Sequence, residues 1–157
     1  MSATTEATRN PRFTSVIDWQ DFNCKISKYF TVGEVTRYDV RRIPRPGSIE
    51  AANILRLAQE LDKIRHEWGA AIGVTSWYRP YEINLAVGGV SNSQHITGSA
   101  VDIYTMDGRD DKFEVFLDEY WCGALGYGVR SGLGFTHLDM RNGRWKHSEG
   151  ELIRWMY

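Results

Sequence analysis

The fold is decided by the stretch SQHITGSAVD, residues 93–102. Side chains alternate between the two faces of a strand, so the apolar neighbours of Asp102 are expected to face the core while its carboxylate points to the opposite side. His95 precedes Asp102 by seven positions, and the Thr97-Gly98 turn can fold the imidazole back beside the carboxylate. Imidazole and carboxylate are both common zinc ligands, so this spacing indicates a candidate metal site.

A second expected strand, residues 135–140, repeats the alternation. Thr136 and Leu138 fall on one face, while His137 and Asp139 fall on the other. Zinc in a hydrolytic site takes three protein ligands and keeps one position open, and two imidazoles with one carboxylate can supply that set. Spacing alone leaves open an ordinary polar role for each of these residues.

The remaining two histidines have surface positions in the pattern. His66 lies near the end of an expected helix, where a cation suits the helix dipole, and His147 lies in a charged tail segment. We expect neither to take part in the chemistry.

The clearest helix runs between Ser48 as its N-cap and Gly69 as its stop, because apolar residues recur there at three- and four-residue steps. A capping box at Thr31 starts a shorter helix. Further elements are expected as strands over 70–77 and 100–104 and as helices over 81–87 and around 113–120, with glycine-punctuated turns over 123–134 and a polar turn at 142–143. This order predicts an α+β fold with a small, largely antiparallel sheet that carries the metal site and with helices packed on one side.

Length and composition bound the remaining possibilities. The 157 residues suit a single domain over 13–157, preceded by a polar, flexible arm over 1–12. A net charge of −1 without blocks of like charge argues against a nucleic-acid partner, and no apolar run is long enough to span a membrane. The start carries no readable export signal, and Cys24 and Cys122 do not suggest a disulfide framework. We expect a monomer.

Residues 93–102 closely resemble the S-x-H-x-x-G-x-A-x-D signature of the zinc D-alanyl-D-alanine carboxypeptidases, a family that shares its fold with the hedgehog signalling domain. The similarity continues upstream in residues 75–79 and 84–93 and downstream in residues 134–139. It covers about residues 25 to 145. Several elements in the right order make this a specific match.

The resemblance implies a role for each matching position. His95, Asp102 and His137 would bind Zn²⁺. Arg79 matches the arginine that holds the substrate carbonyl or carboxylate and supports the developing oxyanion, a task suited to its fixed fork and permanent charge. Two residues beside the metal loop, Ser93 and Gln94, are expected either to bind substrate or to shape the turn.

The general base is where the sequence departs from the family pattern. Many members place an acidic residue three positions before the last histidine, and here that position is Gly134. Asp139 is our candidate base, because it lies two residues past His137 on the same strand face. In a second registration Asp139 would be the ligand and His137 the auxiliary group. Should Asp139 play neither role, Glu149 and Glu151 are the nearest carboxylates in the tail.

The expected function is zinc-dependent hydrolysis of amide bonds in peptidoglycan stem peptides or cross-links, of the D,D-carboxypeptidase or endopeptidase type. Without an export signal or a wall-binding domain, the chain looks like a phage endolysin that is made in the cytoplasm and acts at the bacterial wall after release. The rival expectation is a zinc-stabilised binding module, as in the hedgehog domain, without peptidase activity. A plain α+β domain without metal requires the signature to be accidental.

Overall fold

The structure is a computed structural model that describes residues 16–141 and 152–157. The expected arm over 1–12 lies outside the described residues. So do the expected turn at 142–143, His147, and the two tail carboxylates Glu149 and Glu151.

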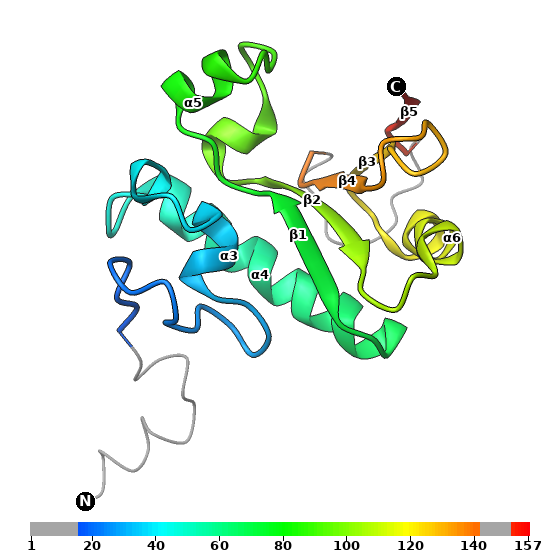
Figure 1. Cartoon of the computed structure of the whole chain (residues 1–157), viewed down its shortest axis with the longest axis horizontal. Coiled ribbons are helices and arrows are strands. Elements are labelled where there is room, and N and C mark those ends of the chain that lie inside the picture. The colour runs from blue at the N-terminus through cyan, green and yellow to red at the C-terminus, as the bar shows by residue number, and fades with distance from the viewer. Residues whose placement is uncertain (1–15, 142–151) are drawn as a thin grey trace, which may run out of the picture.

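Five strands form one sheet in the order β1-β2-β4-β3-β5 (Figure 1). Their bounds are β1 Ile72–Ser76, β2 Ala100–Thr105, β3 Ala124–Tyr127, β4 Thr136–Asp139 and β5 Arg154–Met156. The first four pair antiparallel, and β5 pairs parallel to β3 at the edge. The expected small, largely antiparallel sheet is therefore confirmed.

Four α-helices accompany the sheet in the described part of the chain: α3 Val32–Thr36, α4 Ile49–Trp68, α5 Tyr81–Ala86 and α6 Asp110–Tyr120. Ser48 caps the start of α4 by accepting a hydrogen bond from the backbone N–H of Ala51, and Gly69 ends it in the left-handed conformation. Thr31 and Glu34 form the capping box of α3. No helix among the described residues has both the length and the apolar character needed to cross a membrane.

The hydrophobic core lies on one face of the sheet. Val101 and Ile103 of β2 and Leu138 of β4 are fully buried there, against the apolar stripe of α4 and against α6. Figure 1 shows α4 running along the sheet, with α6 beside the β2 to β3 region. On β2 and β4 the core side is thus the side that alternation predicted.

Two strands were not expected from the sequence. β3 lies within residues 123–134, where the glycine pattern predicts turns. β5 follows in the last residues of the chain. β3 is short and contains a glycine, and β5 depends on parallel pairing with β3, which is distant in sequence, so the local pattern carries little trace of either strand. They form the sheet edge beside the candidate site.

Candidate metal centre

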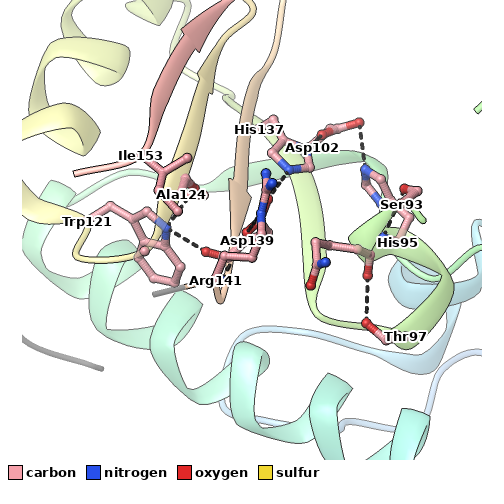
Figure 2. A network of polar contacts seen from close by, with 12 residues as sticks. Ser93, His95, Thr97, Asp102, Trp121, Ala124, His137, Asp139, Arg141 and Ile153 are labelled. Carbon is pink, nitrogen blue, oxygen red and sulfur yellow. Dashed lines mark hydrogen bonds and ion pairs between the residues drawn. The ribbon is translucent and has the colours of Figure 1, made fainter. Parts of the chain in front are cut away.

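The sheet aligns two of the candidate ligands directly. Asp102 on β2 and His137 on β4 are register partners, and they face away from the hydrophobic core. His95 joins them from the short 3-10 helix η2, Gln94–Thr97, which precedes β2. The three buried side chains can each offer one ligand atom, and these atoms lie within 4.8 Å of one another. Figure 2 shows them converging from three segments of the chain.

The loop before β2 fixes the orientation of His95. Its Nδ1 lies 2.6 Å from the carbonyl oxygen of Trp77, so Nδ1–H donates to the backbone and Nε2 is left facing Asp102 Oδ2 at 3.3 Å. The loop itself is held against α4 at Gly98, which adopts a left-handed φ of +79°. A Cβ at this position would lie 2.9 Å from the backbone oxygen of Glu50, so only glycine permits this approach.

Asp102 lies between the two histidines and contacts both. Its Oδ1 lies 2.8 Å from His137 Nδ1, and its Oδ2 faces His95. Burial raises the pKa of this carboxyl, but the contacts with His137 and His95 outweigh burial and hold the pKa well below its ordinary value. Asp102 is therefore a carboxylate, the form that binds a metal.

His137 lies between two carboxylates. Its Nδ1 faces Asp102, while its Nε2 lies 2.7 Å from Asp139 Oδ2. Burial lowers the pKa of His137, but the hydrogen bonds to the two carboxylates more than compensate and raise it to about 9 in the metal-free protein. When Nε2–H donates to Asp139, the lone pair of Nδ1 is directed towards Asp102 and the site.

Asp139 is completely buried, and both of its carboxylate oxygens are engaged. The Arg141 guanidinium donates a hydrogen bond to each oxygen, from Nε to Oδ1 at 2.9 Å and from Nη2 to Oδ2 at 2.9 Å. Its backbone N–H also donates to Oδ1. The backbone oxygen of Asp139 accepts from the indole N–H of Trp121 (Figure 2). These contacts fit a residue that orients His137, since partners of this kind commonly fix a ligating imidazole.

A pocket of about 590 Å³ opens over this cluster. All seven candidate site residues line it: the ligands His95, Asp102 and His137, together with Arg79, Ser93, Gln94 and Asp139. The rest of the lining includes Val90, Asn92, Phe135, Arg141, Trp155 and Tyr157. Within its described part, the structure thus brings together the expected metal ligands, Arg79, Ser93, Gln94 and Asp139.

Arg79 occupies the pocket wall between β1 and α5. Its backbone N–H donates to the carbonyl of His95 at 3.0 Å, which ties it to the loop of the candidate ligand. Its Nε is buried and makes no hydrogen bond to any described residue. Burial lowers the pKa of the guanidinium, against the opposing charge of Asp102. An arginine remains charged under these conditions, so its fork is available to an anionic or carbonyl group in the pocket.

Ser93 and Gln94 both shape the turn that carries His95. Ser93 Oγ accepts from the backbone N–H of His95 at 3.2 Å, and the backbone oxygen of Gln94 accepts from Thr97 Oγ1 at 3.0 Å. The Gln94 side chain has no such contact among the described residues and is the more available of the two to a ligand.

Gly134 adopts a left-handed φ of +80°, and nothing lies within 4 Å of the place its Cβ would take. A glutamate here would be strained by the backbone rather than by lack of room. Among the described residues that line the pocket, the carboxylates are therefore Asp102 and Asp139 alone.

These residues and their order also match a known family. A model of the peptidase M15 family, zinc peptidases of the D-alanyl-D-alanine carboxypeptidase type, matches residues 28–139. The chain belongs to the peptidase M15 family. Its members are zinc-dependent, and two buried imidazoles with one buried carboxylate fit that metal. The expected family and cofactor are confirmed. No curated protein sequence matches the chain significantly.

Sequence reasoning missed three residues of the site: Arg141, Trp155 and Tyr157. Arg141 could have been found from its place two residues beyond Asp139 on the same strand face. The two aromatic residues come from the unexpected strand β5 and its end, and no local pattern marks them. The pKa of Tyr157 is raised to about 12, mainly by burial and also by the negative charge of Asp102, so its hydroxyl stays protonated in the pocket.

The exposed position of His66 on α4 agrees with its expected surface role.

Proposed function

We propose that this M15 peptidase hydrolyses an amide bond in a peptidoglycan stem peptide or cross-link, with zinc held by His95, Asp102 and His137. The observation that carries the proposal is the buried group of three ligand atoms in the floor of a 590 Å³ pocket. When bound, zinc supplies Lewis-acid polarisation and a hydrolytic nucleophile at neutral pH.

The protein's part is to present each ligand in one protonation state and one orientation. The Trp77 carbonyl selects the His95 tautomer with a free Nε2, and the paired histidine contacts keep Asp102 ionised. Because these partners are built into the fold, little rearrangement accompanies metal binding.

Arg79 is the proposed substrate-binding and oxyanion-supporting residue. A buried guanidinium with an unpartnered Nε has unused hydrogen-bonding capacity directed at a polar group of the ligand. Either a terminal carboxylate or a scissile carbonyl satisfies it. Gln94, and less directly Ser93, supports the substrate from the loop on the same side.

The contacts of Asp139 support a positioning role more than the proton-transfer role expected from the sequence. A general base needs a route to the reacting proton, whereas both oxygens of this carboxylate already accept hydrogen bonds from His137 and Arg141. In this proposal Asp139 orients His137 through Nε2. The proton acceptor is then sought in the tail, at Glu149 or Glu151.

More specifically, we propose that the protein is a D,D-carboxypeptidase or D,D-endopeptidase and that it acts as a phage endolysin. The support is the signature at residues 93–102 together with Arg79, whose charge suits a substrate that ends in a carboxylate. The rival proposal, a zinc-stabilised binding module, is favoured by the glycine at position 134, where the usual acid is missing.

The deciding experiment is digestion of purified peptidoglycan, followed by loss of turbidity and by mass analysis of the released peptides. We expect cleavage that chelator abolishes and added zinc restores, and the product masses identify the bond. An Arg79→Ala variant that keeps zinc should lose most of the cleavage. If zinc-loaded wild-type protein binds the wall or its peptides without cutting them, the binding-module proposal replaces this one.

A further inference from the structure

A row of register partners crosses four strands at the candidate site. Asp102 on β2 pairs with His137 on β4, His137 with Gly126 on β3, and Gly126 with Trp155 on β5. Residues in such a row point to the same side of the sheet. Gly126 has no side chain, so the row contains a gap between the imidazole of His137 and the indole of Trp155.

The indole of Trp155 spans this gap. A Cβ on Gly126 would lie 2.8 Å from two atoms of the indole ring, so the ring lies directly over the glycine. The Trp155 ring reaches His137 on the far side, with ring centroids 5.2 Å apart at an angle of 55°. It also contacts the second partner of Asp139, because the Arg141 guanidinium lies 5.2 Å from the ring centroid.

Arg154, the residue before Trp155, holds strand β5 in place through hydrogen bonds of its guanidinium. That guanidinium donates to Asp118 Oδ1 at 2.7 Å and to the backbone oxygens of Trp121 and Gly123, both at 2.8 Å. Asp118 lies on α6, so β5 is held to the end of that helix as well as to β3. The side chain of Trp155 is thereby kept in place although β5 is a short edge strand.

We propose that Trp155 is a positioning residue of the metal centre: it packs against His137 and Arg141 and so fixes the His137 imidazole for zinc. Packing limits rotation of the ring, and the indole reduces the access of water to the hydrogen bond between His137 and Asp139. The C-terminal strand therefore completes the metal site without supplying a ligand. The inference rests on the zinc site proposed above.

The test is the zinc dissociation constant, measured by competition with a chelator. Trp155→Ala should weaken zinc binding about tenfold, the lower end for a residue that acts through a ligand. Trp155→Phe keeps a ring beside His137 and should recover most of the affinity. Met156→Ala is the matched control, since that residue is on the same strand, 57% exposed, and points the other way. The visible spectrum of the cobalt-substituted protein should change in Trp155→Ala and not in Met156→Ala.

A second variant displaces the indole by changing the glycine over which it lies. Gly126→Ala places a methyl group 2.8 Å from the indole ring and from the Tyr157 hydroxyl, so it should displace Trp155 and also weaken zinc binding. This variant decides the matter if Trp155→Ala does not fold. Zinc affinity unchanged in the folded variants, or weakened equally by Met156→Ala, would overturn the inference while leaving the zinc site intact. A wild-type protein that binds no zinc would instead contradict the proposed function.

Discussion

The two faces of the central sheet have opposite chemistry although they are formed by alternating residues of the same two strands. On β2 and β4, Val101, Ile103 and Leu138 point into the hydrophobic core, while Asp102 and His137 point to the pocket. Both sets are buried. The core face is stabilised by the removal of apolar surface from water, whereas the pocket face keeps ionisable groups buried at a cost in free energy.

The pocket face is tolerated because its groups satisfy one another. Asp102 and Asp139 both contact His137, and Arg141 adds a second cation beside Asp139. Such a network is stable only when complete, because removal of one member leaves another group buried without its partner. The comparison therefore predicts that changes on the core face affect stability alone, whereas changes on the pocket face affect metal binding and activity as well.

The largest effect is expected for His95→Ala on the pocket face. Loss of a direct ligand should weaken zinc binding by more than about a hundredfold, the upper end for residues that only contact a ligand, and should abolish wall hydrolysis. His66→Ala, on the exposed side of α4, is the control and should retain one zinc per chain. Metal analysis of both purified variants makes the measurement. Equal zinc content in the two proteins would remove His95 from the site.

Leu138→Ala tests the opposite face one residue away from His137. Leu138 is fully buried, so truncation should lower the free energy of unfolding by about 2 to 5 kcal/mol. The folded fraction should bind zinc with nearly the wild-type dissociation constant. Denaturant unfolding combined with chelator competition measures both quantities. A large loss of affinity without loss of stability would mean that the two faces are not separate in function.

Much of this division could be predicted from the sequence. Alternation around Asp102 and His137 gave the direction of each side chain, and the caps at Ser48 and Thr31 gave the helix starts. The resemblance at residues 93–102 added the family, and its continuation at residues 75–79 added Arg79. These signals are local, so they survive in a single sequence.

The rest of the site depends on contacts that no local pattern records. The glycines at 123, 126 and 128 read as turns, yet Gly126 lies within β3 and provides the space for the Trp155 ring. β5 pairs with β3 across nearly thirty residues, in parallel, and only then does its indole reach His137. Strand alternation places Asp139 near His137 and so makes it a candidate base, but alternation does not show that Arg141 donates hydrogen bonds to both of its oxygens.

Asp139→Asn distinguishes positioning from proton transfer. If Asp139 orients His137, zinc affinity should fall by about 10- to 100-fold. If it is the base, zinc binding should stay normal while turnover falls by roughly two to four orders of magnitude. Zinc affinity and wall-peptide hydrolysis are measured on the same preparation. Normal values for both quantities would exclude either role.

The pH dependence of zinc binding tests the same contacts without a substitution, through a gradual change in affinity. Zinc needs the neutral imidazole, and the metal-free His137 holds its proton up to a pKa of about 9. Zinc affinity should therefore rise by about tenfold for each pH unit between pH 7 and 9 and then level off. Because the contact with Asp139 is one cause of the raised pKa, Asp139→Asn should move the plateau to lower pH. A flat profile over this range would show that no proton leaves His137 on binding.

The most direct test of the central claim is anomalous diffraction at the zinc edge from crystals of the zinc-loaded protein. The account predicts one strong peak per chain on the pocket face of the sheet, within bonding distance of His95, Asp102 and His137, with Asp139 bonded to His137 rather than to the metal. A peak bonded to Asp139 in place of His137, or no peak in this pocket while the protein still cleaves peptidoglycan, would contradict it.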